Sequence, residues 1–193
     1  RFDGYTDGAA SESKILRDVL KAGDTWFNTG DLIVEVDVGF TMGKPHYQFV
    51  DRIGDTFRWR SENVSTNEVG EILNANQQVE IANVYGVDVP ATEGKAGMVS
   101  LALKPGKIFD ADEFSTYVSA NLPGYAQPVF IRIQSDISTT GTFKLIKGDL
   151  RKQAFHLQQL GDDAIYVMMP RSKAYQKLDQ LLYESIIDGS AGY

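Results

Sequence analysis

The spacing of hydrophobic and polar residues changes along the first part of the chain. Residues 9–21 carry hydrophobic residues at helical spacing after a serine-containing start, which predicts a helix. From residue 33 the pattern turns to the β-formers Ile33, Val34 and Val36, which predicts a strand, and further extended runs follow at 46–50 and 56–60. Gly54 is the only glycine between these two runs, so it is the best candidate for a domain boundary.

Helical and extended patterns alternate in the rest of the chain. A hydroxyl residue that can cap a helix, Ser65 or Thr66, precedes the first helical pattern, and Asp110 precedes the second. The patterns predict helices over 65–75, 110–122, 147–155 and 173–187, and strands over 79–89, 97–103 and 128–134. We therefore expect an α+β fold with a small sheet after Gly54 and a β-rich segment before it.

Composition excludes several classes of function. Acidic residues outnumber basic ones by 26 to 19, which argues against a nucleic-acid-binding surface. The chain has no cysteine, which excludes disulfides, thiolate zinc sites and cysteine nucleophiles, and His46 and His156 are too few for a histidine-rich metal cluster. No hydrophobic run approaches the ~20 residues of a membrane helix, and no signal peptide is present. The start without methionine suggests a piece of a longer protein.

Three polar residues are candidates for chemistry, although each is ordinary when taken alone. Asp31 follows Gly30 in the stretch NTGDL, which is typical of a β-turn but also suits a rigid carboxylate that binds the two hydroxyls of a ribose. Arg52 ends a predicted strand beside Gly54, and Lys144 follows a loop of threonine and glycine. Arginine and lysine are mostly solvent-exposed, so these residues gain meaning only from their order and spacing.

That order resembles the C-terminal end of the acyl-adenylate-forming superfamily. FNTGDL resembles its ribose-binding motif, DRIGDTFRWRSENVSTNEVG its hinge motif, and TTGTFKLIK its catalytic-lysine loop. The stretches DTFRWRSENVSTNEV, YGVDVPATEGKAGM and TGTFK resemble more specifically the branch of very-long-chain acyl-CoA synthetases and fatty acid transport proteins. The resemblance extends from about Phe2 to Tyr183.

The resemblance implies a role for each candidate residue. Asp31 would bind the ribose hydroxyls of ATP or AMP with Arg52 as its partner, and Lys144 would be the catalytic lysine of adenylation. Residues 1–52 would be the end of a large N-terminal domain that binds nucleotide and acyl group, and Ile53, Gly54 and Asp55 the hinge. Residues 56–193 would be a mobile C-terminal domain with a three-stranded sheet, helices, and a two-stranded hairpin at the hinge.

The hinge motif also implies a channel for coenzyme A, and here the sequence departs from the family pattern. Arg60, Ser61, Glu62 and Asn63 would line the pantetheine channel. Ser61 stands where glycine is usual, so its side chain is expected to narrow the channel that thioester formation needs. Gly70 stands where glutamate is usual, within a predicted helix, where glycine costs up to about 1 kcal/mol relative to alanine.

The implied function is the C-terminal part of an ATP-dependent ligase that converts a long or very long fatty acid to acyl-AMP and then to acyl-CoA. The implied cofactors are ATP and Mg²⁺, the metal being held mainly by the N-terminal domain, with coenzyme A as co-substrate; we expect no metal site in these 193 residues. The implied partners are the fatty acid and the N-terminal domain of the same chain. The implied location is the cytoplasmic side, with any membrane association through the N-terminal part.

Three alternatives remain open from the residues. The protein could be a fatty acyl-AMP ligase that stops at the adenylate, a lipid-uptake protein in which ligation traps fatty acid, or a small α+β domain used only for binding. Because the phosphate-binding loop and acyl pocket of the family would lie upstream, the 193 residues are expected to be inactive alone.

This expectation is directly testable. Incubation of the purified chain with ATP, Mg²⁺, a long-chain fatty acid and coenzyme A is expected to release no pyrophosphate, because the groups that hold the triphosphate and the acyl chain are expected to lie upstream. A coupled pyrophosphate assay measures this, and turnover by the chain would refute the expected incompleteness.

Overall fold

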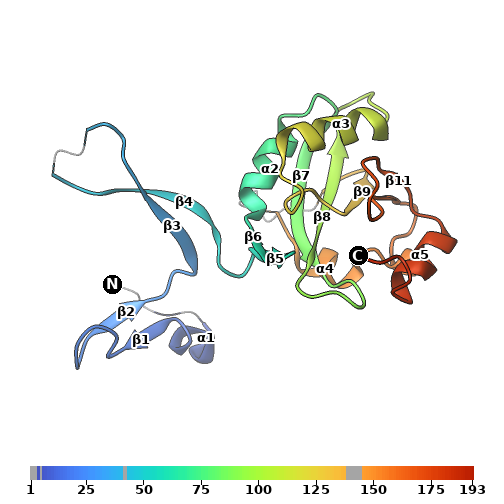
Figure 1. The fold of residues 1–193 in the computed structure, drawn as a ribbon. Helices are drawn as coiled ribbons and strands as arrows, with labels where there is room; N and C mark the ends of the chain where they lie inside the picture. Colours follow the sequence, from blue (N-terminus) through green and yellow to red (C-terminus); the bar gives the residue numbers. More distant parts are fainter. Residues whose placement is uncertain (1–3, 5, 41–42, 138–144) are drawn as a thin grey trace. The chain divides into compact units, whose positions relative to one another are not determined.

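The computed structural model describes residues 4, 6–40, 43–137 and 145–193. The chain divides into two compact units, Arg1–Gly54 (unit 1) and Asp55–Tyr193 (unit 2). Figure 1 shows the elements of both units. Each unit is described separately below.

Unit 1 consists mainly of short antiparallel strands. A helix, α1 (Gly8–Glu12), is followed by β1 (Ile15–Arg17), β2 (Thr25–Phe27), β3 (Asp31–Val36) and β4 (His46–Arg52). Strands β1 and β2 form one two-stranded sheet, and β3 and β4 form another.

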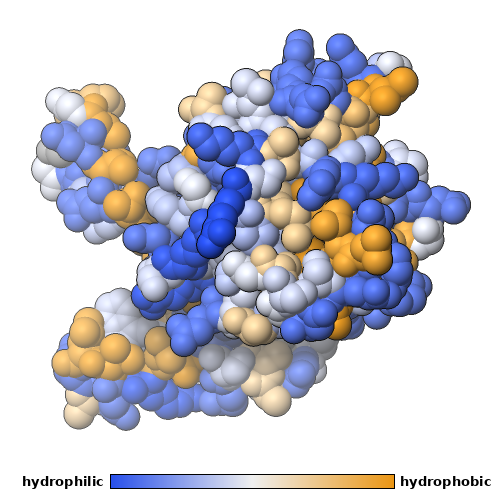
Figure 2. Space-filling model, turned by 45° about the vertical axis from the view of Figure 1, so that its right-hand side comes forward, coloured by the Kyte–Doolittle hydropathy of each residue, from blue (hydrophilic) through white to orange (hydrophobic). Residues whose placement is uncertain are grey.

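Most hydrophobic side chains of unit 1 are exposed (Figure 2). They include Leu20, Ile33, Phe40 and Tyr47, and among the described residues of this unit only Asp51 is buried. Two-stranded sheets without a covered hydrophobic face are marginally stable. Within its described residues, unit 1 therefore has no hydrophobic core of its own.

The predicted helix over 9–21 is wrong beyond its first turn. Helix α1 ends at Glu12, and residues 15–17 pair with residues 25–27 as strands β1 and β2. The carboxylate of Asp24 accepts hydrogen bonds from the backbone N–H groups of Val19, Leu20 and Lys21, which holds that segment in a tight loop. The indole N–H of Trp26 also donates to Asp24 and lowers the pKa of its carboxyl group.

Unit 2 is built on a mixed five-stranded sheet. Its order is β11-β10-β9-β8-β7, in which β8 and β9 are parallel and the other neighbours antiparallel. The strands are β7 (Val79–Val87), β8 (Ala96–Leu103), β9 (Phe130–Gln134), β10 (Ala164–Val167) and β11 (Gln176–Lys177). The helices are α2 (Thr66–Asn74), α3 (Ala111–Asn121), α4 (Gly148–Gln153) and α5 (Gln180–Ile187), with a 3₁₀ turn at Leu157–Gln159.

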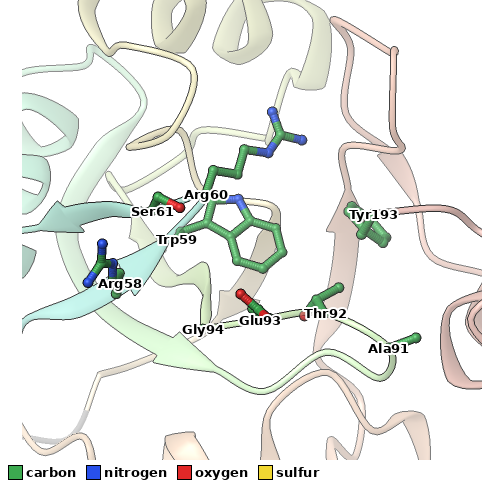
Figure 3. Close-up of a pocket in the computed structure, with 9 residues that line it drawn as sticks. All are labelled: Arg58, Trp59, Arg60, Ser61, Ala91, Thr92, Glu93, Gly94 and Tyr193. Carbon is green, nitrogen blue, oxygen red and sulfur yellow. The ribbon is translucent and has the colours of Figure 1, made fainter.

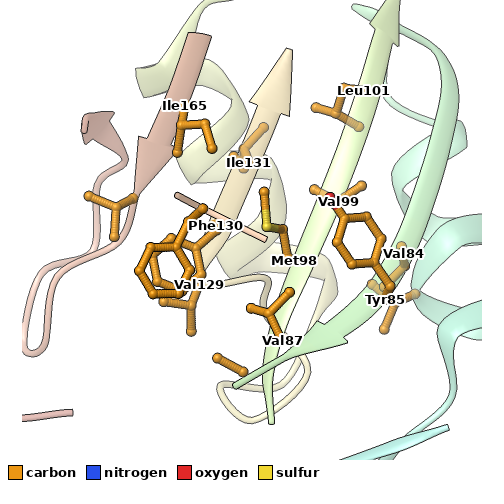
Figure 4. Packing of buried hydrophobic residues seen from close by; sticks show 14 of the residues in the cluster. Val84, Tyr85, Val87, Met98, Val99, Leu101, Val129, Phe130, Ile131 and Ile165 are labelled. Carbon is orange, nitrogen blue, oxygen red and sulfur yellow. The ribbon is translucent and has the colours of Figure 1, made fainter. Parts of the chain in front are cut away.

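The core of unit 2 lies on both sides of this sheet. Consecutive residues of β7 and β8 are buried, as expected when both faces of a strand are covered. Figure 4 shows Tyr85, Met98 and Phe130 packed in this core. The ring of Phe130 stacks on Phe155, which follows α4, with centroids 4.2 Å apart and planes 5° from parallel.

A hairpin of β5 (Phe57–Trp59) and β6 (Glu62–Val64) precedes the sheet in sequence and packs against it. Phe57 lies so close to Gly86 of β7 that a Cβ atom at position 86 would be 2.7 Å from the Phe57 Cβ. A Cβ at Gly97 of β8 would be 3.2 Å from the Phe57 ring. Because Gly86 and Gly97 have no side chains, Phe57 of the hairpin can pack directly against β7 and β8.

The α+β class and the hairpin are confirmed, but the sheet has five strands where three were expected. Strands β10 and β11 were not predicted, and the helix predicted over 173–187 begins only at Gln180. Residues 176–177 pair with β10, and Asp179 then caps α5 by accepting from the N–H of Leu182. Within the described part of the chain, no helix is long and hydrophobic enough to cross a membrane.

The uneven burial predicts how the two units unfold. Residues 55–193 alone are expected to unfold cooperatively, with a Tm within about 2 °C of that of the whole chain, because the buried hydrophobic residues of the described structure lie there. Residues 1–54 alone are expected to show no cooperative transition in thermal circular dichroism. Loss of the transition on removal of residues 1–54 would contradict this division.

Candidate functional site

The turn before β3 holds the backbone of Asp31 in a defined conformation. The N–H of Gly30 donates to Oδ1 of Asn28 (2.9 Å), and the N–H of Asp31 donates to Oγ1 of Thr29 (3.1 Å). Gly30 has a φ of +77°, which favours glycine. The N–H of Ile53 donates to the Gly30 carbonyl at 2.9 Å, so the turn is tied to the end of β4.

Asp31 and Arg52 face each other across the first pair of the β3–β4 ladder. The guanidinium Nε of Arg52 lies 2.9 Å from Oδ1 of Asp31, and its Nη1 donates to the carbonyl of Thr29 at 3.3 Å. Oδ1 of Asp31 is buried and accepts no well-directed hydrogen bond from the described residues, so the contact with Arg52 is an ion pair. The Asp31 side chain as a whole is 28% exposed, so part of it is accessible to solvent.

The boundary between the two units falls at the predicted hinge residues, between Gly54 and Asp55. Ile53 is exposed, and a Cβ at Gly54 would meet no atom within 4 Å. Gly54 also lacks a positive φ, so the conformation seen here does not itself require glycine. Asp55, by contrast, is held by ion pairs to Lys147 and Arg151.

The loop of the β5–β6 hairpin consists of two residues, Arg60 and Ser61. Their φ values are +51° and +67°, the left-handed conformation that a tight two-residue hairpin loop requires. This conformation costs a residue with a side chain roughly 1–2 kcal/mol. The left-handed backbone therefore favours glycine over the serine present at position 61, whether or not a channel passes this loop.

A cavity of about 600 Å³ opens beside this loop (Figure 3). Three segments of unit 2 line it: the hairpin, the turn after β7, and Tyr193. The lining residues are Arg58, Trp59, Arg60, Ser61, Ala91, Thr92, Glu93, Gly94 and Tyr193. Cationic, aromatic and carboxylate groups therefore meet in one cavity, as in sites that bind polar molecules.

The cavity wall depends on a close backbone approach at Gly94. Gly94 has a φ of +82° and forms an isolated bridge with Trp59, while the N–H of Lys95 donates to the Arg58 carbonyl at 2.7 Å. A Cβ at position 94 would overlap the Arg58 carbonyl oxygen. Burial raises the pKa of Tyr193, which Arg60 partly offsets, so its phenol stays protonated at neutral pH.

The structure brings some of the predicted residues together and separates others. Asp31 and Arg52 form a pair, and Arg60 and Ser61 share a cavity wall, whereas Glu62 and Asn63 lie on β6 outside that wall. Lys144 lies outside the described residues. The described residues contain no group of three or more histidine or carboxylate side chains that could hold a metal ion.

Sequence reasoning missed Trp59, the turn 91–94 and Tyr193 as cavity residues. Trp59 stands inside the quoted hinge motif and could have been included by its position in the hairpin. Gly94 and Tyr193 are far from that motif in sequence. Only the fold brings them beside it.

Comparison with known proteins identifies related sequences. Residues 68–144 match the family described as AMP-binding enzyme C-terminal domain. The chain is 44% identical over 174 residues to the medium/long-chain-fatty-acid–CoA ligase FadD6 of Mycobacterium tuberculosis, covering 90% of this chain and 28% of that protein. It is 43% identical over 190 residues to long-chain fatty acid transport protein 3 of Homo sapiens, covering 98% of this chain and 27% of that protein. The chain thus spans between a quarter and a third of the length of these relatives.

A solved structure shares the fold. The amide bond synthetase McbA from Marinactinospora thermotolerans superposes with a TM-score of 0.61 at 24% identity, over 79% of this chain and 29% of that one. At this identity the likeness concerns the fold alone.

The hairpin loop generates a stability prediction. Ser61→Gly is expected to raise the free energy of unfolding by about 0.5–1 kcal/mol, because relief of the left-handed strain exceeds the extra chain entropy of glycine. Urea unfolding monitored by Trp fluorescence measures it. As a matched control, Ser185→Gly in helix α5 is expected to lower stability by about the same amount. Destabilisation by Ser61→Gly would contradict the strain argument.

Proposed function

We propose that the chain is the C-terminal part of an ATP-dependent fatty acyl-CoA ligase of the acyl-adenylate-forming superfamily. The match of residues 68–144 to the AMP-binding enzyme C-terminal domain and the 44% identity to a fatty-acid–CoA ligase support this proposal. The proposed reaction joins a fatty carboxylate to ATP, giving acyl-AMP and pyrophosphate, and then transfers the acyl group to the thiol of coenzyme A. Long or very long acyl chains are the proposed substrates, as the names of the relatives suggest.

The ion pair of Asp31 and Arg52 is the observation that carries this proposal. A carboxylate can accept hydrogen bonds from two neighbouring hydroxyls at once. Arg52 holds the Asp31 carboxylate through the contact of its Nε with Oδ1, and we propose that the ribose hydroxyls bind to the accessible part of this carboxylate. We assign Asp31 to the ribose hydroxyls of ATP and AMP, with Arg52 as its positioning partner.

Lys144 is the proposed catalytic lysine of the adenylation step. Attack of a carboxylate on the α-phosphorus of ATP brings negative charges together, and negative charge accumulates at the phosphoryl oxygens. An ammonium group can bridge the carboxylate and the α-phosphate, an electrostatic contribution of about 10²–10³ in rate. Mg²⁺ would neutralise the triphosphate, and its ligands are proposed to lie outside this chain.

The second step requires that the lysine withdraw, since coenzyme A must reach the same carbonyl carbon. We propose that the residues Ile53, Gly54 and Asp55 act as the hinge, with residues 1–52 and 56–193 as the bodies that they join. Glycine lets a few backbone dihedrals absorb a large rotation. The open space around Gly54 supports this assignment.

The cavity beside Arg60 and Ser61 is the proposed contact surface for the pantetheine arm of coenzyme A. Glu62 and Asn63 lie on β6, outside the cavity wall. We propose that only the backbone of these two residues contributes to the contact surface. The Ser61 side chain stands on the wall and narrows the passage relative to glycine. The alternative within the same chemistry is a fatty acyl-AMP ligase, which forms the adenylate and does not transfer the acyl group to coenzyme A.

A role in lipid uptake is the second candidate, because several relatives are named long-chain fatty acid transport proteins. In that case ligation would trap fatty acid that has crossed a membrane. We propose the cytoplasmic side as its location, with membrane attachment outside these residues.

Substitution of Lys144 tests the proposal in the full-length ligase. Lys144→Ala is expected to lower the rate of acyl-AMP formation about 10²–10³-fold, through loss of the bridging charge. Thioester formation from supplied acyl-AMP is expected to stay within about threefold of the unsubstituted rate, since the lysine acts only in the first step. Pyrophosphate exchange and acyl-CoA release measure the two steps.

Lys152→Ala is the matched control, because this lysine is exposed and pairs only weakly with Asp149. The control is expected to keep both activities. If Lys144→Ala leaves acyl-AMP formation unchanged, the proposed function of this residue is wrong.

A further inference from the structure

A second cavity adjoins the one beside the β5–β6 hairpin loop. Its volume is about 230 Å³, and Trp59, Arg60 and Tyr193 line both cavities. The guanidinium carbon of Arg60 lies 6.0 Å from the centroid of the Trp59 ring, and Figure 3 shows the Arg60 side chain extending past that ring. The wall shared by the two cavities is therefore cationic and aromatic, and one elongated molecule can contact both.

The second cavity is lined by cations without a carboxylate. Arg60, Arg171 and Lys173 stand among its lining residues, which include no aspartate or glutamate. This holds although acidic residues outnumber basic ones in the chain by 26 to 19. Within the described part of the chain none of the three cations forms an ion pair. A cavity lined by charge of one sign concentrates ions of the opposite sign, so this cavity suits an anion.

Arg171 occupies a strained position in a tight turn. The turn runs from Met169 to Ser172 and is closed by the N–H of Ser172, which donates to the Met169 carbonyl at 2.9 Å. Pro170 is its second residue, and Arg171, the third, has a φ of +65°. This is the pattern of a type II turn, whose third position favours glycine. An arginine kept in such a conformation is typical of a functional site.

Both ends of this cationic turn, residues 169–173, are held by buried or partly buried tyrosines. On one side the phenol of Tyr193 donates to the Met168 carbonyl at 3.0 Å. On the other side Tyr175 is buried, and its phenol donates to the Pro128 carbonyl at 2.6 Å. The turn is therefore fixed to the sheet, and its two cations line the cavity from an anchored backbone.

We propose that Arg171 and Lys173 bind the 3′-phosphate of coenzyme A, and that Arg60 contacts its diphosphate. This inference rests on the proposed function, which assigns the pantetheine arm to the first cavity. In coenzyme A the diphosphate follows the pantetheine arm, and the adenosine with its 3′-phosphate comes last. The diphosphate then falls at the shared wall and the nucleotide end in the second cavity.

The assignment makes Arg171 and Lys173 specificity-determining residues for the second step. Both lie outside residues 68–144, the part of the chain that matches the AMP-binding enzyme C-terminal domain. A phosphate monoester accepts charge-assisted hydrogen bonds from guanidinium and ammonium groups. Dephospho-coenzyme A lacks only this phosphate, so the two cations are expected to favour coenzyme A over it.

Kinetics of thioester formation from supplied acyl-AMP in the full-length ligase test the inference. The unsubstituted enzyme is expected to show kcat/KM for coenzyme A on the order of tenfold above that for dephospho-coenzyme A. Arg171→Gln/Lys173→Gln is expected to lower kcat/KM for coenzyme A on the order of tenfold, mainly through KM, and that for dephospho-coenzyme A by less than about twofold. Acyl-AMP formation is expected to stay unchanged.

Two further variants separate binding from structure. Lys177→Gln is the matched control, because this lysine is exposed on β11 and does not line the cavity, so the preference for coenzyme A is expected to persist. Arg171→Gly removes the cation together with the backbone strain. It is expected to raise the thermal unfolding midpoint while lowering the preference for coenzyme A, a combination that a purely structural arginine would not give.

The outcomes distinguish this inference from the proposed function. If the unsubstituted ligase uses both thiols equally well, or if Arg171→Gln/Lys173→Gln keeps the preference, the inference is wrong and the proposed function stands. An equal loss with both thiols also overturns it. If the ligase forms no thioester with either thiol, the coenzyme A step of the proposed function fails and the inference fails with it. Should the double variant fail to fold, Arg171→Gly and Lys173→Gln decide singly by the same ratio.

Discussion

The close approach of the β5–β6 hairpin to the central sheet is the constraint on which the arrangement of unit 2 depends. Glycines at 86 and 97 leave space for Phe57, and the backbone of Gly94 lies against the Arg58 carbonyl. A side chain at position 86 or 94 would push the hairpin away from the sheet, since Cβ atoms do not approach other atoms so closely. The packed hairpin then fixes the position of Asp55, which precedes β5. It also fixes Arg60 and Ser61, which line the cavity at the hairpin loop.

Electrostatic contacts extend this order to a segment that hydrophobic packing holds less firmly. Helix α4 has only six residues, and none of them is buried. A helix this short has little stability in isolation. Its ion pair to Asp55, the packing of Leu150 against the core and the neighbouring stack of Phe155 on Phe130 all contribute to its defined position. Charge and aromatic packing thus complement each other at the two ends of α4.

The sequence predicted those elements whose pattern is settled by local contacts. Helices α2 and α3 follow a capping residue, and β7 and β8 are long hydrophobic runs, so both their type and position were predictable. The segment 13–21 was mispredicted because the carboxylate of Asp24 and the pairing of β1 with β2 override its helical spacing. Strand β11 has two residues, too few for any periodic signal. For the site, the order of Asp31, Arg52 and Lys144 could be read in sequence, whereas the contact of Asp55 with Arg151 depends on tertiary folding.

The backbone contact at Gly94 also restricts how the cavity can diversify. Because no L-residue with a side chain fits at 94, differences in the shape and charge of this cavity among relatives must arise at neighbouring positions such as Thr92 and Glu93, or in the hairpin loop. Changes in ligand preference at this cavity are therefore expected to come from the side chains around the Gly94 backbone contact and not from that contact itself.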